Sequence, residues 1–68
     1  MEVKVFLERE NKKEKVSLEK EITVEELMRQ LGVNKAEVVP VKNNELVTED
    51  SIVKAVDDIK FLAVISGG

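Results

Sequence analysis

The stretch "ITVEELMRQLG", Ile22 to Gly32, carries the clearest local signal in the sequence and predicts a short helix. Thr23 is a favourable N-cap residue, and Glu26 three residues later completes the pattern of a capping box. Gly32 suits the left-handed conformation that ends many helices. Such a helix has only about two turns and does not persist alone, so it must rest on a sheet. The apolar residues that would face this sheet recur at helical spacing: Val24, Leu27, Met28 and Leu31.

The segments before this helix predict a β-hairpin. In "EVKVFLE", apolar and polar residues alternate as in a half-buried strand, with Val3, Val5 and Leu7 on one face and Phe6 on the other. The basic cluster "NKKEK", residues 11–15, is expected to be a solvated hairpin loop. A second strand follows in "KVSLEK", so the chain is expected to open with two antiparallel strands.

Two further strands are predicted after the helix. The run "VVPVK" predicts a strand over residues 38–42, and Asn43 and Asn44 predict a turn into a short strand at residues 45–47. Pro40 cannot donate a hydrogen bond within a sheet. Part of its strand is therefore expected at an edge or beside a bulge.

The last part of the chain supplies a polar connection and a final strand. In "TEDSIVKAVDD", Ile52, Val53 and Val56 are expected to close the base of the core. The run "DIKFLAVI", residues 58–65, alternates as a strand. The element order is thus ββαββ with a final β. It predicts one domain over residues 1–68 of the α+β class, a mixed sheet with one main helix across one face.

Composition narrows the possible chemistry. The 68 residues include no cysteine and no histidine, which excludes disulfides, a thiol nucleophile and the usual zinc ligands. The net charge of −3 argues against nucleic acid as a partner, and no apolar run is long enough to cross a membrane. A cytoplasmic protein is therefore expected. The acidic pairs Asp57-Asp58 and Glu49-Asp50 are interpreted as solvated turn residues, so the chain is not expected to be an enzyme itself.

The order of elements and the ending Ser66-Gly67-Gly68 together resemble the ubiquitin-like sulfur carriers of the ThiS/MoaD family. The resemblance covers essentially the whole chain, and a terminal Gly-Gly directly after a strand is its most specific part. The chain departs from the family by having Asn43-Asn44 where carriers often have Asn-Gly. The resemblance implies a β-grasp fold with a flexible tail at about residues 66–68.

The resemblance also implies the chemistry and the partners. An E1-like enzyme of the ThiF/MoeB kind would use ATP and magnesium to adenylate the carboxylate of Gly68, and a sulfur donor would convert it to a thiocarboxylate. Sulfur would then pass to an acceptor such as a thiazole synthase or the large subunit of molybdopterin synthase, or be used in tRNA thiolation. No cofactor is expected on the chain itself. Glycines in the tail would let the backbone pass closely through a narrow channel.

Two other functions remain open on the sequence. The activated Gly68 could instead be attacked by a lysine, which would make the chain a ubiquitin-like protein modifier. Alternatively, the domain could be a non-covalent β-grasp binding module. If one face of the sheet is covered by the helix, then Phe6, Leu62 and Val64 lie on the uncovered face, where we expect a partner interface. The competing interpretation is that scattered apolar residues on an open sheet have no role.

Overall fold

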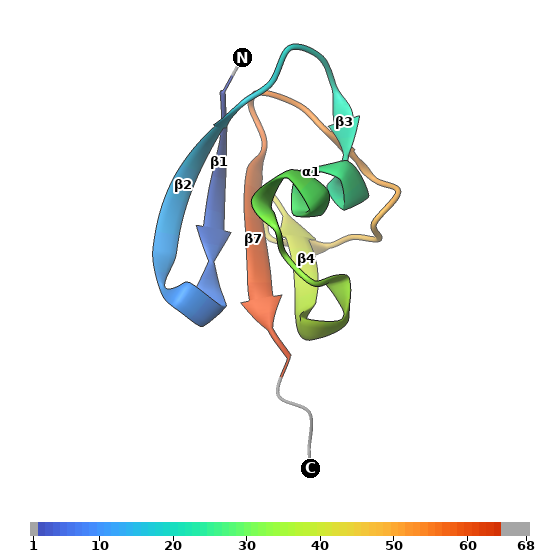
Figure 1. Ribbon diagram of the computed structural model, residues 1–68. Coiled ribbons are helices and arrows are strands. Elements are labelled where there is room, and N and C mark those ends of the chain that lie inside the picture. The colour runs from blue at the N-terminus through green and yellow to red at the C-terminus, as the bar shows by residue number, and fades with distance from the viewer. Residues whose placement is uncertain (1, 65–68) are drawn as a thin grey trace.

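The computed structural model describes residues 2–64, and these form a mixed sheet with one main helix across one face (Figure 1). This is the α+β architecture predicted from the sequence. The final strand lies inside the sheet, parallel to the first strand and antiparallel to the fourth. From one edge to the other, the five strands are β2 (Lys12–Ser17), β1 (Glu2–Leu7), β7 (Asp58–Ala63), β4 (Val38–Lys42) and β5 (Glu45–Leu46).

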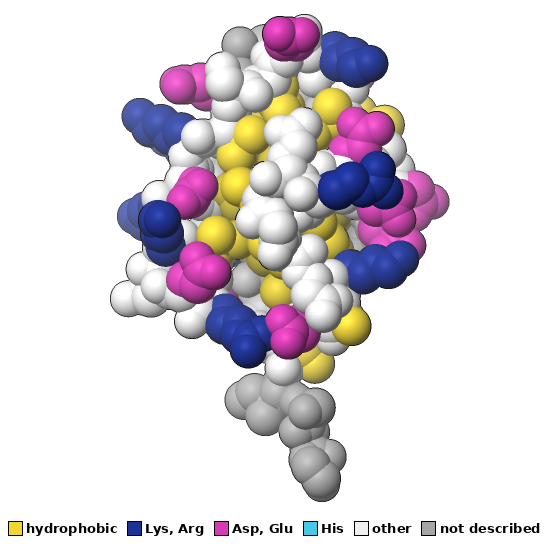
Figure 2. Space-filling model, in the orientation of Figure 1, with side chains coloured by type: hydrophobic (Ala, Val, Ile, Leu, Met, Phe, Trp, Pro, Cys, Tyr) yellow, Lys and Arg dark blue, Asp and Glu magenta, His cyan; other side chains and the backbone are white. Residues whose placement is uncertain are grey.

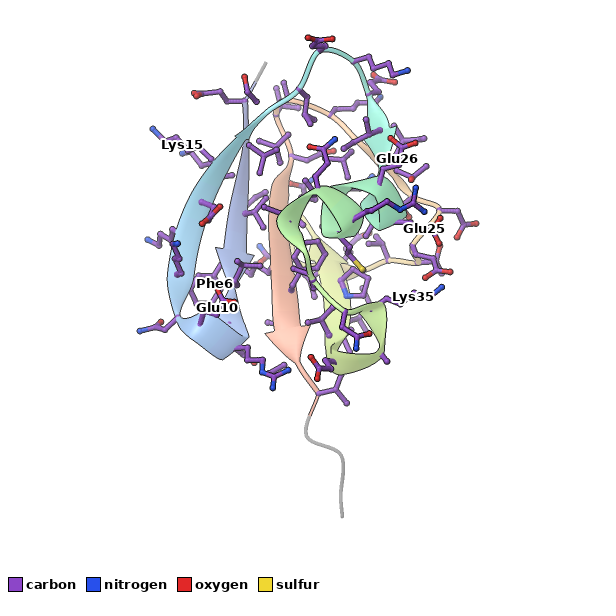
Figure 3. The ribbon with its side chains drawn as sticks, viewed as in Figure 1. Phe6, Glu10, Lys15, Glu25, Glu26 and Lys35 are labelled. Atoms are coloured by element: carbon purple, nitrogen blue, oxygen red, sulfur yellow. The ribbon has the colours of Figure 1, made fainter. Side chains whose placement is uncertain are left out.

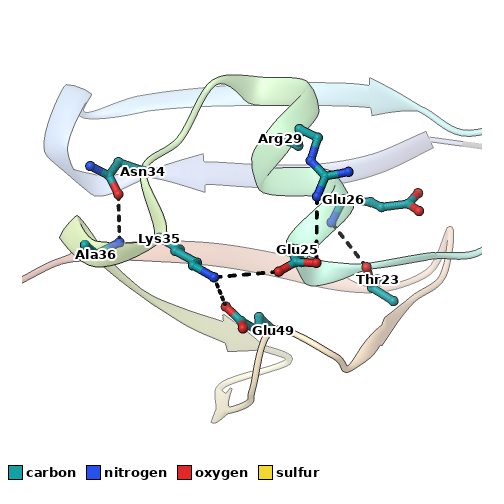
Figure 4. Close-up of polar contacts among 8 residues, drawn as sticks. All are labelled: Thr23, Glu25, Glu26, Arg29, Asn34, Lys35, Ala36 and Glu49. Carbon is teal, nitrogen blue, oxygen red and sulfur yellow. Dashed lines mark hydrogen bonds and ion pairs between the residues drawn. The ribbon is translucent and has the colours of Figure 1, made fainter.

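The main helix, α1 (Val24–Leu31), begins and ends as its sequence predicts. The backbone N–H of Glu26 donates to Oγ1 of Thr23 at 3.2 Å, which caps the first turn (Figure 4). Gly32 ends the helix in the left-handed region at φ 69°, and its N–H donates to the carbonyl of Arg29. Within residues 2–64, no helix is long and apolar enough to cross a membrane.

The hydrophobic core lies between α1 and the sheet. Phe61, Ile59 and Leu27 are fully buried, and each such side chain contributes about 1.5–3 kcal/mol relative to remaining exposed. The hairpin, α1, β7 and short segments between them supply the buried residues of this core: Val3, Val5, Leu7, Leu18, Ile22, Val24, Leu27, Met28, Val53, Ile59 and Phe61.

The hairpin loop predicted at residues 11–15 is wrong, because β2 already begins at Lys12. The chain reverses earlier, through the single turn η1 (Glu8–Glu10) and through Asn11 in the left-handed region at φ 49°. β2 is an edge strand that the helix hardly covers, so its first residues are charged on both faces. A strand of this kind lacks the apolar alternation on which the prediction relied.

The expected contribution of Ile52 and Val56 to the core is also wrong. β6 (Ile52–Val53) pairs with β3 (Ile22–Thr23) in a separate two-stranded sheet, which the sequence did not predict. Side chains of adjacent strand residues point to opposite sides, so Val53 is buried while Ile52 is 43% exposed. Val56 lies in the following turn and is 89% exposed.

The edge position predicted for part of the proline strand is confirmed. β4 pairs with β7 along its whole length, and Pro40 lies opposite Phe61. On its other side, β5 pairs only with Val41 and Lys42. Pro40 therefore needs no N–H there, although its carbonyl accepts a hydrogen bond from the N–H of Val47 at 3.2 Å.

Candidate functional site

The end of β7 is held by backbone hydrogen bonds to two neighbouring turns. The N–H of Ala63 donates to Oε1 of Glu8, in η1, at 2.9 Å. The N–H of Val64 donates to the carbonyl of Glu37 at 2.9 Å, and Glu37 is the last residue of the turn η2 (Lys35–Glu37). The chain therefore leaves the sheet from a fixed point between η1 and η2.

Side-chain contacts reinforce these two turns. The Arg9 guanidinium in η1 forms an ion pair with the carboxylate of Glu37 in η2. Both side chains are largely exposed, so the pair contributes little energy by itself. Oδ1 of Asn34 accepts the N–H of Ala36 at 2.9 Å and caps η2 (Figure 4). The exit point of β7 is thus built by local caps and by one bridge between the turns.

The residues predicted to carry the chemistry follow this exit point in sequence. Gly68, the expected site of modification, and the tail residues Ser66 and Gly67 lie outside the described residues 2–64. The last described residue, Val64, is 45% exposed.

The predicted interface residues lie on the face of the sheet that α1 does not cover. β1 and β7 are neighbours, and Phe6 lies opposite Lys60 in their parallel register. Leu62 follows two residues after Lys60 and hence points to the same face. Phe6 and Leu62 are half-buried, and Val64 is exposed. The fold therefore brings Phe6, Leu62 and Val64 to one open face.

Sequence reasoning missed three apolar residues that share this face. Val39 lies opposite Leu62, and Val41 lies opposite Lys60; Val41 is buried and yet stands outside the core cluster. Leu46 lies opposite Val41 and is 74% exposed. The run "VVPVK" is apolar on both sides, so only its register against β7 identifies the outward residues. We define the open-face apolar surface as Phe6, Val39, Val41, Leu46, Leu62 and Val64.

Asp57, directly before β7, is structural, which corrects its interpretation as a solvated turn residue; Asp58 is the exposed first residue of β7. Asp57 is buried and accepts hydrogen bonds from the N–H of Lys54 at 2.8 Å and the side-chain amide of Asn43 at 3.0 Å. Burial favours the neutral carboxyl, but these two hydrogen bonds and the charges of Lys42 and Lys54 together outweigh it, and the pKa of Asp57 is lowered. The carboxylate is thus stabilised as a hydrogen-bond acceptor, in a form poorly suited to general acid catalysis.

The same network joins β7 to the β4–β5 turn. Asn43 and Asn44 form this turn, as predicted, and both lie in the left-handed region, at φ 52° and 69°. The N–H of Asn43 donates to the carbonyl of Asp58 at 2.9 Å, and the N–H of Asp58 donates to Oδ1 of Asn43 at 3.0 Å. Glu49, from the other acidic pair, is 3.7 Å from Nζ of Lys35 in an ion pair (Figure 4). Across residues 2–64, no three acidic side chains are grouped as a metal site requires.

The mixed sheet, the single helix across it and the central final strand define a ubiquitin-like β-grasp protein of the ThiS/MoaD type. The model of the family small archaeal modifier protein 2 matches residues 1–65, and the chain belongs to this family of small ubiquitin-like carriers. It is also similar to a thiamine biosynthesis protein from Geobacter metallireducens, whose solution structure was determined by NMR. The two share 26% sequence identity with a TM-score of 0.61, over 96% of this chain and 87% of the other. No curated protein matches the chain.

Proposed function

We propose that the chain is a sulfur carrier whose C-terminal carboxylate, on Gly68, is adenylated and then converted to a thiocarboxylate. The observation that carries this proposal is the fixed exit of β7, followed in the sequence by Ser66-Gly67-Gly68. The similarity to a thiamine biosynthesis protein supports it. The family model matches residues 1–65, and the role of the tail follows from the sequence Ser66-Gly67-Gly68 and from the chemistry of its carboxylate.

Activation is needed because a carboxylate is a poor electrophile. In the proposed reaction, an oxygen of the Gly68 carboxylate attacks the α-phosphorus of ATP and pyrophosphate leaves, which gives an acyl-adenylate. A donor of sulfide-level sulfur then attacks the acyl carbon, the bond from this carbon to AMP breaks, and Gly68 carries –COSH. An E1-like enzyme of the ThiF/MoeB kind supplies ATP and magnesium. The chain has no cysteine, so the C-terminus is the place where it would carry sulfur.

The two glycines have a physical role in this proposal. The tail must bring its carboxylate to an ATP that is bound in another protein, and residues without Cβ allow close approach of the backbone. Hydrogen bonds from Ala63 and Val64 fix the start of this path on the domain. Acceptors of the sulfur would be an enzyme such as a thiazole synthase, the large subunit of molybdopterin synthase or a tRNA-thiolating enzyme, in the cytoplasm.

A second function is favoured by the match to a family of modifier proteins. In this alternative, the ε-amine of a lysine on a target protein attacks activated Gly68, and an isopeptide bond replaces the bond to the leaving group. Both functions begin with the same adenylate, and one chain can perform both. The third possibility, a non-covalent binding module, requires no reaction at Gly68.

Intact-mass spectrometry separates the three functions. The chain is incubated with an E1-like enzyme, ATP, magnesium and a sulfur source. Exchange of one oxygen for sulfur at the C-terminus is the expected result for a carrier, and a branched adduct on lysine is the expected result for a modifier. If the enzyme activates a control carrier but the mass of this chain does not change, both the carrier and the modifier functions would be contradicted.

The matched variants are Gly68→Ala and a chain lacking Gly68. Both changes lie after the last strand, so the far-UV circular dichroism spectrum and the melting temperature should not change. ATP–pyrophosphate exchange should fall by about 100-fold, because a small misplacement of reacting atoms is costly. Exchange at the normal rate by either variant would overturn the proposal.

A further inference from the structure

The open face also carries a pocket, which lies near the start of β7. The face is hollowed there into a shallow pocket of about 650 Å³ over β1, β2 and β7. In the strand order of the sheet, the pocket lies toward the edge formed by the β1–β2 hairpin. We call it the lysine pocket, because four lysines line it together with Val5, Phe6, Glu14 and Asp58: Lys4, Lys13, Lys15 and Lys60.

The strand register brings four lysines around one aromatic ring. Lys4 lies directly opposite Lys15 across the hairpin, on the face opposite the core. In the next row, Phe6 lies between Lys13 on β2 and Lys60 on β7. Lys15 extends from β2 on the side away from α1 (Figure 3). The pocket therefore has an apolar centre and a basic rim built from three strands.

Four lysines and two carboxylates, Glu14 and Asp58, line the pocket, so its lining carries an excess of positive charge. None of the four forms an ion pair with a described residue, whereas lysines elsewhere do: Lys12 is 3.0 Å from Glu14, and Lys35 is 3.8 Å from Glu25. Like charges directly opposite each other in a sheet destabilise it, and Lys4 and Lys15 have this arrangement. The chain has a net charge of −3, so the convergence of four lysines does not follow from a general excess of basic residues.

Protection of a sheet edge accounts for only half of the cluster. Lysines on an edge strand prevent it from pairing with another chain, and this explains Lys13 and Lys15 on β2. Lys4 and Lys60 lie on β1 and β7, which have a strand on each side. Those two lysines protect no edge, so edge protection does not explain why they lie beside Phe6.

We propose that the lysine pocket binds an acidic segment of a partner protein. Carboxylates of the segment would pair with the four lysines, and one apolar side chain would pack on Phe6. A nucleic acid fits less well, since a longer strand would cross the acidic remainder of a chain whose net charge is −3. The proposal does not depend on any reaction of Gly68.

The test is an NMR titration of the full ¹⁵N-labelled chain with a synthetic peptide of glutamates around one central leucine. Shifts of backbone amides should concentrate in β1, β2 and the start of β7. The double variant Lys13→Glu/Lys60→Glu should bind at least about tenfold more weakly, because two attractions become repulsions. Raising the salt from about 0.05 to 0.5 M should also weaken binding, since the Debye length shortens.

The control is Lys20→Glu/Lys54→Glu, which makes the same change of charge at two exposed lysines outside the pocket. This variant should bind the peptide almost as the unaltered chain does. Equal weakening by both double variants, or no binding by the unaltered chain, would overturn the proposal. A single-stranded oligonucleotide of the same charge serves as the competing probe, and tighter binding of the oligonucleotide would reassign the pocket to nucleic acid. Thermal melts of both variants verify that they fold.

Discussion

The two faces of the sheet use the same strands for different purposes. On the face under α1, the side chains of β1 and β7 are almost completely buried, for example Val5, Ile59 and Phe61. On the opposite face, Phe6 and Leu62 from the same two strands are half-buried, with no helix above them. Neighbouring residues along one strand therefore differ in whether their apolar area stabilises the fold or remains available for contact.

The faces also differ in how their charges are arranged. On the helix-covered face, basic and acidic side chains are interspersed (Figure 2), and Lys35 lies within reach of both Glu25 and Glu49. On the open face, four lysines converge on the lysine pocket without such partners. We therefore expect substitutions on the helix-covered face to change stability, and substitutions on the open face to change binding.

The largest expected effect is on the helix-covered face. Phe61→Ala should lower the free energy of unfolding by about 3–5 kcal/mol, because it leaves a cavity in a fully buried site. Leu62→Ala, one residue along the same strand, should cost only about 1 kcal/mol. Urea unfolding followed by circular dichroism measures both. If Phe61→Ala does not fold at all while Leu62→Ala does, the difference between the two positions is the same in direction and larger in size. Equal losses at positions 61 and 62 would contradict the distinction between the faces.

The next effect concerns the register that keeps the two faces distinct. A slip of β7 by one residue would exchange Phe61 and Leu62 between faces, and the hydrogen bonds of Asp57 and Asn43 oppose such a slip. Asp57→Asn should cost about 1–3 kcal/mol, because Asn43 and Lys54 donate to different oxygens of Asp57 and an amide replaces one of these acceptors with an NH2 donor.

The stability that Asp57 contributes should also depend on pH. The pKa of Asp57 is lower in the folded state, so its ionisation stabilises the fold at pH values above about 3.9, its ordinary value. That contribution is lost as the pH falls through the folded pKa. Urea unfolding between pH 6 and 2 should show a steeper acid loss for the unaltered chain than for Asp57→Asn. Parallel pH curves would show that Asp57 is not the group responsible.

The smallest expected effect on stability, and the most specific effect on binding, comes from the open face. Phe6→Ser with Leu62→Ser should weaken binding to the proposed activating enzyme by about tenfold, since few residues carry most of the energy of an interface. The matched control is Ile52→Ser with Val56→Ser, two exposed apolar residues outside the open-face apolar surface. Titration calorimetry measures the affinity. Unchanged affinity in the first variant, or an equal loss in the control, would remove the interface from this surface.

Residues with a local signal were predicted correctly. Thr23 and Gly32 mark the two ends of α1, as predicted, because capping depends on a few neighbouring residues. The alternation of residues around Phe61 correctly predicted the strand β7. Errors arose where the environment, and not the local pattern, decides the structure. β2 is charged because it is an edge strand, and Ile52 points outward because β6 pairs with β3.

The candidate site shows the same division. Phe6, Leu62 and Val64 were assigned to one face because alternation along a strand is local. Val39 and the lysine pocket depend on the register between strands distant in the sequence, such as Lys4 opposite Lys15. The role of Asp57 depends on a contact with Asn43, fourteen residues away along the chain. Sequence patterns of a single chain do not contain these pairings.

The central position of β7 has a consequence for synthesis of the protein. Because β7 joins β1 to β4, the five-stranded sheet cannot be completed until residues 58–63 have left the ribosome. A chain that stops earlier lacks Ile59 and Phe61 and leaves the apolar side of β1 without its neighbour. The strand that leads to the proposed site of reaction is thus also the strand that completes the fold, so truncated products should be unfolded targets for proteolysis and poor competitors for the partners of the native protein.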